Sequence, residues 1–413
     1  MDKNTFLFKQ HLSKNKVALF FFATMMIGFL GARSIASVSL FLFGVNALRD
    51  IPPREWLRQK WWLLGLVWIG ILAVSWFWST NKTEWGAHFQ VKLPFLILPL
   101  AFGFLPPGTT RQLQVFTWIF VGFITLGCLY SLSFFVRDPQ AYIQGYSYSH
   151  TIPSPTYNYH IGFSTAVALC IGWCIYSLPL WARRTTRCII LAIALFLAVY
   201  LHILAAKTGL VAFYIFLIGY LVYLFCSISW KKGLLMLLIA GIGITAAYQF
   251  VPTFRTRIGY TTYTWMRYKE GERTGNYSDM GRVISYKIAL RIISMHPLVG
   301  VGAGDMLDEM SAGYDRWYPQ IPQEQRLIPH NQFLTHALAT GIPSMLVFII
   351  WILAPFRYIK RNREGAFFII TWLMLLVPLF TDPFLEVQFG VFVYLFFFLM
   401  QRSLIIPIRP IAQ

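Results

Sequence analysis

The chain has 413 residues, of which 57% are hydrophobic, 18% aromatic and only 12% charged. This composition excludes an ordinary soluble globular domain of this size and is typical of a polytopic membrane protein. The formal net charge of +19 does not indicate nucleic-acid binding, because membrane topology explains most of the basic residues, which face anionic lipid head groups. We therefore expect membrane lipids, and no nucleic acid, among the partners.

Apolar runs long enough to cross a bilayer as a helix recur along almost the whole chain. Twelve can be distinguished, of which the first two are short. They cover residues 15–31, 34–48, 61–79, 91–106, 112–136, 159–180, 187–206, 209–229, 233–251, 331–356, 366–381 and 386–407. The expected fold is an all-α polytopic membrane protein with about 12 transmembrane helices.

The distribution of Lys and Arg indicates the orientation, because these residues concentrate in short cytoplasmic loops. With the N-terminus and the C-terminus both cytoplasmic, seven cytoplasmic segments hold 20 of the 35 basic residues, and ten more lie in one long outer loop, 252–329. The short outer connections hold only Arg33, Lys82, Lys92, Arg137 and Lys207. We therefore divide a single membrane domain into spans one to nine at 1–251, the loop at 252–329 and spans ten to twelve at 330–413.

The outer loop is too long for a simple connector, and long loops inside compact architectures are usually functional. Its stretch DMGRVISYKIALRIISMH, at residues 279–296, has apolar residues at helical spacing, so we expect a helix there. The glycines of GVGAGD, at 300–305, follow no strand and are expected to form a turn that returns the loop to the membrane, rather than a nucleotide-binding loop. Asp305, Asp308 and Glu309 are interpreted as a solvated helix start.

Two cations stand at the expected outer surface. Lys207 lies in AAKTGL, a turn so tight that its ammonium must stay at the membrane surface; the alternative to a functional role is a snorkelling lysine. Arg282 lies on the expected loop helix and offers a planar fork that matches two phosphate oxygens; the alternative is an ordinary solvated arginine. Both are candidates for contact with an anionic substrate.

His330 and Asn331 stand where a membrane helix begins, four residues after Arg326. A histidine titrates near neutral pH, so His330 is suited to accept a proton from a hydroxyl nucleophile, although an interfacial histidine can also be structural. Asn331 is either a helix cap or a partner that orients His330. His160 begins another membrane helix at the same outer face. We treat His160, Arg326 and Asn331 as candidate substrate contacts.

Three outer motifs are similar in order and spacing to those of a known family. PHNQFLTHALATGIPSMLVF contains His-Asn, an apolar helix start and Gly-Ile-Pro. GRVISYKIALRIISMHPLVGVGAGD has an arginine-bearing helix followed by Pro-Leu-x-Gly-x-Gly, and LAAKTGLVAFYI has a tight outer turn. Together they resemble the O-antigen ligase and O-antigen polymerase superfamily, and most of all its ligases. The resemblance extends over residues 155–405.

The resemblance implies a membrane glycosyltransferase with a GT-C-like helical fold in the bacterial inner membrane. Family members take a glycan from undecaprenyl diphosphate at the periplasmic face and transfer it to an acceptor hydroxyl, which for an O-antigen ligase belongs to the lipid A core. By this resemblance His330 is the general base, and Arg282 binds the donor diphosphate and stabilises the leaving group. Lys207 stands where the family commonly has Arg, which keeps the charge but loses the bidentate fork.

A diphosphate is already a good leaving group, so cations can meet the needs of the reaction. We therefore expect no metal and no cofactor, and direct displacement that inverts the anomeric centre. Cys170 and Cys174 share a helix face, but no His or acidic residue neighbours them in the sequence, so we expect no metal there.

Three other functions stay open at this point. An O-antigen polymerase would often carry a second long outer loop with an Arg-x10-Gly motif; Arg291 and Gly302 provide that spacing once, and residues 137–158 hold no second copy. A protein O-oligosaccharyltransferase of the same superfamily would use a protein hydroxyl as the acceptor. A transporter of lipid-linked glycans, which is a different class, would place ionisable residues near the membrane midplane rather than at its outer surface.

Overall fold

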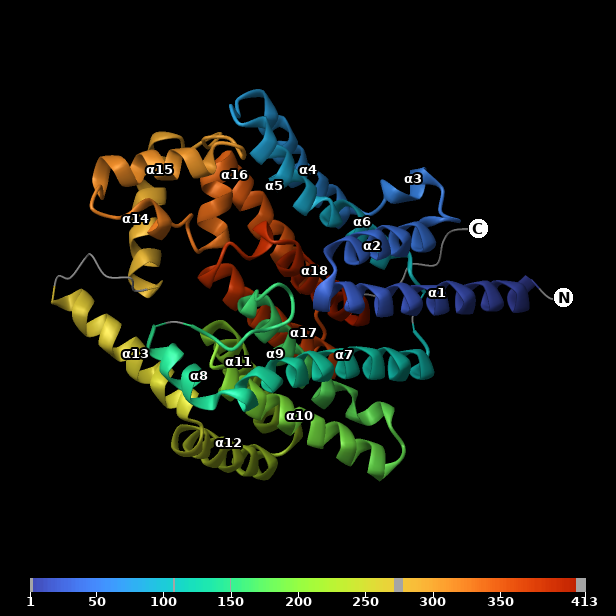
Figure 1. The fold of residues 1–413 in the computed structure, drawn as a ribbon. Helices are drawn as coiled ribbons and strands as arrows, with labels where there is room; N and C mark the ends of the chain where they lie inside the picture. Colours follow the sequence, from blue (N-terminus) through green and yellow to red (C-terminus); the bar gives the residue numbers. More distant parts are fainter. Residues whose placement is uncertain (1–2, 107, 149, 271–277, 406–413) are drawn as a thin grey trace.

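The computed structural model describes residues 3–106, 108–148, 150–270 and 278–405, and every regular element within these ranges is a helix (Figure 1). The α-helices are α1 (Lys3–Gly31), α2 (Arg33–Leu48), α3 (Pro53–Trp56), α4 (Lys60–Val74), α5 (Lys82–Lys92), α6 (Pro94–Phe104), α7 (Thr110–Arg137), α8 (Pro139–Gly145), α9 (His160–Ser177), α10 (Arg184–Leu204), α11 (Lys207–Tyr223), α12 (Trp230–Phe250), α13 (Pro252–Lys269), α14 (Ser278–Met295), α15 (Met306–Trp317), α16 (Gln332–Leu353), α17 (Arg363–Thr381) and α18 (Gln388–Ile405). Short 3-10 helices are η1 (Ser75–Phe77), η2 (Tyr146–Tyr148), η3 (Leu178–Leu180), η5 (Gln323–Gln325), η6 (Ala354–Tyr358) and η7 (Phe384–Glu386), and η4 (Leu224–Ile228) is a π-helical turn.

Ten helical stretches of the described chain are long and apolar enough to cross a membrane, which confirms the prediction of an all-helical, multi-pass membrane protein. They are Lys14–Gly31, Lys60–Phe77, Lys82–Phe104, Thr110–Arg137, His160–Leu180, Arg184–Leu204, Lys207–Ile228, Trp230–Phe250, Gln332–Tyr358 and Arg363–Thr381. Two further apolar helices, Arg33–Leu48 and Gln388–Leu404, are shorter. The 16 residues of α2 extend over about 24 Å, less than the roughly 30 Å of hydrocarbon in a bilayer. The number of twelve spans therefore stays a prediction.

The described residues between α12 and α16 include the α-helices α13, α14 and α15, which lie at the end of the bundle away from the start of α1 (Figure 1). Helix α14 confirms the helix predicted over residues 279–296. Its Ile284, Ile288 and Ile292 recur every fourth residue and are buried with residues of α15 and with residues 337–339 of α16 in one hydrophobic cluster. This cluster fixes the loop helices against the first half of α16.

Helix α16 is interrupted at Gly341, whose φ is +86° and ψ is 166°. The interruption releases carbonyl groups that a continuous helix would bond internally. The Val301 N–H donates to the Leu338 carbonyl over 2.9 Å. The Gly302 N–H donates to the Ala339 carbonyl over 3.0 Å. Gly302 has a φ of +100°. The glycine-rich turn predicted for GVGAGD therefore docks onto the broken helix and satisfies its backbone.

Asp305, just before α15, contradicts the interpretation of a solvated helix start. Its side chain is only 9% exposed. The two carboxylate oxygens accept hydrogen bonds from the Thr80 N–H at 2.9 and 2.7 Å, and one also accepts from the Asn81 N–H at 2.8 Å. The interpretation was wrong for Asp305 because sequence does not show that backbone donors at the start of α5 lie beside it. Asp308 and Glu309 are exposed, as predicted.

Replacing Gly341 with Ala should destabilise the fold. A Cβ at this position would lie 2.1 Å from the Leu298 carbonyl oxygen, in a backbone conformation that side chains rarely adopt. We expect the free energy of unfolding to fall by about 2 kcal/mol or more, seen as a lower Tm of the detergent-purified protein. Gly241→Ala is the matched control, because a Cβ there meets open space inside α12 and improves helix propensity. A wild-type Tm for Gly341→Ala would contradict this account of the break.

Candidate active site

Helix α16 begins directly after His330 and Asn331. The Asn331 Oδ1 accepts hydrogen bonds from the backbone N–H groups of Phe333 at 3.0 Å and Leu334 at 3.1 Å. Asn331 is therefore the N-cap of α16, which decides between the two roles that the sequence left open. The cap holds His330 at the helix start, with 20% of its side chain exposed.

His330 is paired with a carboxylate that follows α17. Its Nδ1 lies 3.0 Å from Asp382 Oδ1, and the Asp382 side chain is only 6% exposed. The Tyr159 hydroxyl donates a 2.7 Å hydrogen bond to the other Asp382 oxygen. Burial raises the pKa of Tyr159 well above its usual range, and the charge of Asp382 raises it further, so Tyr159 stays protonated. An imidazole whose Nδ1 faces a carboxylate presents Nε2 as its basic nitrogen.

A small polar pocket gathers positive charge from four helices, α9, α11, α13 and α14. Its lining includes His160, Lys207, Thr208, Arg257 and Arg282. The ammonium of Lys207 and the guanidinium of Arg257 both approach the ring of Tyr260, at 5.9 and 5.7 Å from its centroid. Like charges that line one pocket repel one another, and a bound anion would relieve that repulsion.

Two contacts connect the cationic pocket to the carboxylate of Asp382. His160, which lines the pocket, directly follows Tyr159, the hydrogen-bond donor to Asp382. Thr208, also in the lining, has its Oγ1 3.2 Å from Oγ1 of Thr381, the residue before Asp382. The pocket and the carboxylate are therefore neighbours in space.

Helix α14 brings Arg282 to the same place. Tyr286 lies one turn after Arg282 on the same helix face. Its hydroxyl donates a 2.6 Å hydrogen bond to the His330 carbonyl. Helix α14 thus connects the arginine in the pocket to the backbone of the candidate base. The structure brings Lys207, His160, Arg282 and His330, which the sequence had singled out separately, into one region.

Arg326 is placed differently from the other candidate contacts. Its guanidinium donates to Ser311 Oγ at 3.0 Å and pairs with Asp315 at 2.5 Å, both on α15. It is not among the residues that line the cationic pocket. Arg326 therefore ties α15 to the segment that leads into His330.

The sequence did not single out Tyr159, Arg257 and Asp382, which belong to this arrangement. Asp382 carried a usable signal, because a single carboxylate directly after an apolar span is costly without a partner, and the alternation of spans puts it on the same side as His330. Tyr159 and Arg257 carried none, since tyrosines are common at membrane interfaces and arginines are common in outer loops of this length.

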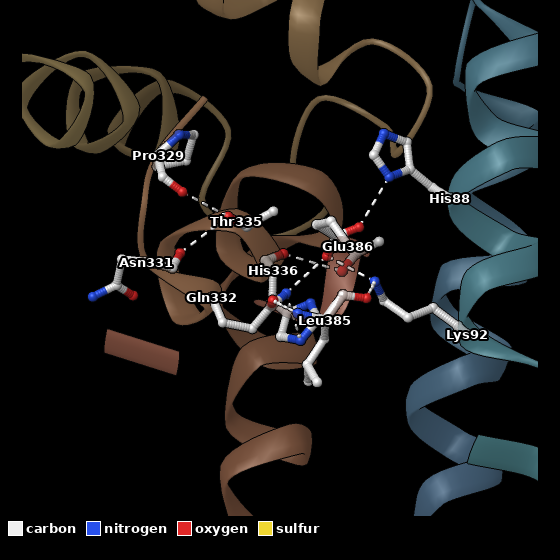
Figure 2. Close-up of polar contacts among 10 residues, drawn as sticks. His88, Lys92, Pro329, Asn331, Gln332, Thr335, His336, Leu385 and Glu386 are labelled. Atoms are coloured by element: carbon white, nitrogen blue, oxygen red, sulfur yellow. Dashed lines mark hydrogen bonds and ion pairs between the residues drawn. The ribbon is translucent and has the colours of Figure 1, made fainter. Parts of the chain in front are cut away.

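A buried network lies behind the start of α16 and fixes the turn after α17 (Figure 2). Lys92 Nζ on α5 lies 2.8 Å from Glu386 Oε1, and His88 Nδ1 on the same helix lies 2.9 Å from Oε2. Gln332 Nε2 on α16 donates to Glu386 over 2.7 Å, and Gln332 Oε1 accepts from the Leu385 N–H over 2.6 Å. Both carboxylate oxygens of Glu386 are therefore held by other elements.

Burial and neighbouring charges act in opposite directions on Glu386. Burial alone raises the pKa of its carboxyl, but Lys92, the hydrogen bond and charge of His88, and His336 together hold that pKa well below its usual range. Glu386 is therefore an ionised carboxylate at neutral pH. A buried charge is tolerated only when it is paired and hydrogen-bonded, and this one is.

No group of three or more His, Cys, Asp or Glu side chains gathers as a metal site in the part of the chain that the structure describes. Cys170 and Cys174 are buried in α9 as free thiols. The ionisable groups around the pocket are an imidazole–carboxylate pair and several cations, which suit proton abstraction and anion binding.

Residues 190–349 match a protein-family model described as O-antigen ligase. This match supports the resemblance to the O-antigen ligase superfamily that the sequence motifs indicated. The matched segment runs from α10 into α16 and contains Lys207, Arg257, Arg282 and His330, whereas Asp382 lies beyond it. No curated protein matches the chain.

Breaking the buried ion pair between Lys92 and Glu386 should strongly destabilise the protein. Lys92→Met leaves the Glu386 carboxylate without its cation, and we expect a loss of about 3 to 5 kcal/mol in the free energy of unfolding, read as thermal unfolding in detergent. The double variant Lys92→Met/Glu386→Leu should recover much of that loss, because no charge remains buried. Lys60→Met, at an exposed lysine, serves as the control. Wild-type unfolding of the single variant would refute the role given to the pair.

Proposed function

We propose that the chain is an inverting, metal-independent glycosyltransferase that performs O-antigen ligation in lipopolysaccharide biosynthesis. It moves a glycan from undecaprenyl diphosphate to a hydroxyl of a lipid A core acceptor. The observation that carries this proposal is the His330–Asp382 pair beside a pocket lined by Lys207, Arg257 and Arg282. The family match over residues 190–349 supports it.

His330 acts as the general base. With Nδ1 facing Asp382 at 3.0 Å, Nε2 takes the proton of the acceptor hydroxyl as its oxygen attacks the anomeric carbon. The bond from that carbon to the diphosphate oxygen breaks on the opposite face, so the anomeric configuration inverts. The imidazolium formed is stabilised by the Asp382 carboxylate and later returns its proton to water. Tyr159 and Tyr286 hold the pair in position through their hydrogen bonds.

The cationic pocket binds the donor diphosphate and stabilises the charge that stays on the departing lipid diphosphate. Arg282 and Arg257 supply planar forks that match pairs of phosphate oxygens. Lys207 adds a point charge at the position where the family commonly has Arg. Lys lacks the guanidinium fork of Arg, and Arg257 supplies such a fork instead. Fixed cations of this kind supply the electrostatic stabilisation that a divalent metal provides in other glycosyltransferases.

The same proposal sets the site at the periplasmic face of a bacterial inner membrane in a GT-C-like helical fold, with both chain ends cytoplasmic. It is supported by the excess of Lys and Arg in the short loops at the other end of the spans. A polymerase or a protein O-oligosaccharyltransferase would use the same base and the same cations with another acceptor, so the acceptor assay distinguishes them.

Reconstituted full-length protein, supplied with an undecaprenyl-diphosphate glycan and a lipid A core acceptor, should form the glycosidic product in the presence of EDTA. His330→Ala should lower kcat about 100-fold or more, because the general base is lost. Asp382→Asn should lower kcat with little change in KM, because it removes the charge that stabilises the imidazolium. His150→Ala, at an exposed outer-loop histidine, is the control. Full turnover by a correctly inserted His330→Ala enzyme would rule out this mechanism.

Loss of a pocket arginine should weaken both donor binding and leaving-group departure. We expect Arg282→Ala to lower kcat/KM about 100-fold or more. Arg282→Lys should retain part of the activity, because lysine keeps the positive charge but lacks the bidentate guanidinium. Lys207→Arg should keep or raise activity, since it supplies a second pair of donors. The assay is donor-dependent turnover, and Arg316→Ala, at an exposed residue of α15, is the control. Wild-type kinetics for Arg282→Ala would remove this residue from the site.

A further inference from the structure

A groove of about 640 Å³ lies between α1 and α7. Its volume is within the range of ordinary small-molecule sites. The end of the groove at Lys16 is distant from the candidate active site, because Lys16 lies 15 residues before the end of α1 at Gly31. That separation is about 22 Å along the helix. The Gly31 carbonyl, at the other end, accepts a hydrogen bond from Tyr157, two residues before Tyr159.

The groove has an apolar wall on both helices. From Lys16, the positions of Leu19, Phe20 and Ala23 follow at three, four and seven residues, which is one face of α1. Val115 and Ile119 line the groove from α7. Phe20 is 62% exposed and Val115 is 42% exposed, so this wall is open to the surroundings of the bundle. In a membrane-spanning pair of helices those surroundings are lipid chains.

One end of the groove is polar and positively charged. Lys16 and Arg111 line it within two residues of the starts of their candidate spans, which is head-group level. Both side chains are exposed, and neither forms an ion pair with a carboxylate of the described chain. Their charge is therefore available to an external anion.

Gln112 adds a donor at this polar end. Its side chain is only 9% exposed, and its Oε1 accepts from Asn15 Nδ2 at 3.1 Å and from the Thr109 N–H at 2.9 Å. Gln112 is one of the residues that line the groove, and its Nε2 has no hydrogen-bond partner among the described residues. A buried donor without a partner costs free energy, which an acceptor oxygen in the groove would recover.

We propose that this groove binds one anionic phospholipid of the cytoplasmic leaflet. Its phosphate is held by Lys16, Arg111 and the Gln112 Nε2–H, and an acyl chain follows the apolar wall towards Ala23. A zwitterionic phospholipid fits less well, because its head group brings a positive charge of its own close to Lys16 and Arg111. A free phosphate would leave the apolar wall unused. The site is independent of the proposed glycosyl transfer.

The test measures lipid retention by full-length protein in vesicles of phosphatidylglycerol and phosphatidylcholine, followed by native mass spectrometry. Wild type should retain one phosphatidylglycerol in preference to phosphatidylcholine. The double variant Lys16→Gln/Arg111→Gln should lose that preference by roughly 25-fold, about 5-fold for each basic residue at a membrane surface. The matched control, Lys231→Gln/Lys232→Gln, removes two exposed basic residues at the start of α12 and should keep the preference.

A second variant tests the apolar wall without changing charge. Ala23→Phe fills the groove and should abolish retention of the lipid, whereas Val45→Phe on the exposed face of α2 should not. The proposal is overturned if wild type shows no preference, if both double variants lose it equally, or if Ala23→Phe retains the lipid. It is also overturned if the groove is covered by a second copy of the chain, seen as a dimer that Ala23→Phe dissociates.

Discussion

The arrangement of the site depends on one buried carboxylate. Glu386 sits in the turn between α17 and α18 and is held by Lys92 from α5 and by Gln332 from α16. Burying an ion pair brings little net stability, but its geometry fixes which elements meet and in what register. The same turn carries Asp382, and the same end of α16 carries His330. The network behind the site therefore sets the 3.0 Å approach of imidazole and carboxylate.

The second constraint is the interruption of α16. A continuous helix would have no free carbonyls for the glycine-rich turn, and Gly341 provides them. Through this docking and the shared hydrophobic cluster, α14 is held against the start of α16, so that Arg282 reaches the pocket while Tyr286 contacts His330. The base and the cations come from elements far apart in the chain, and the backbone hydrogen bonds of the turn act together with side-chain packing to bring them together.

The local sequence pattern predicted the positions of helices and of tight turns, because these depend mainly on neighbouring residues. Apolar periodicity located the spans and α14, and the His-Asn pair marked a capped helix start. The tight turn at Lys207 was also readable, because two apolar runs there are separated by only a few residues. Asp305 was misjudged, and Asp382 and Arg257 were missed, because a single charged residue has no periodicity. What such a residue pairs with depends on the tertiary structure, as for Asp305, which accepts hydrogen bonds from the Thr80 N–H 225 residues away in the sequence.

The central claim is that the His330–Asp382 pair and the cationic pocket are two parts of one site. The most direct measurement is a structure of the full chain with an undecaprenyl-diphosphate glycan analogue that cannot be cleaved. This account predicts a diphosphate in contact with Arg282 and Arg257, and an anomeric carbon that faces His330 Nε2 across the space for an acceptor hydroxyl. A diphosphate bound away from these arginines, or an anomeric carbon shielded from His330, would contradict it.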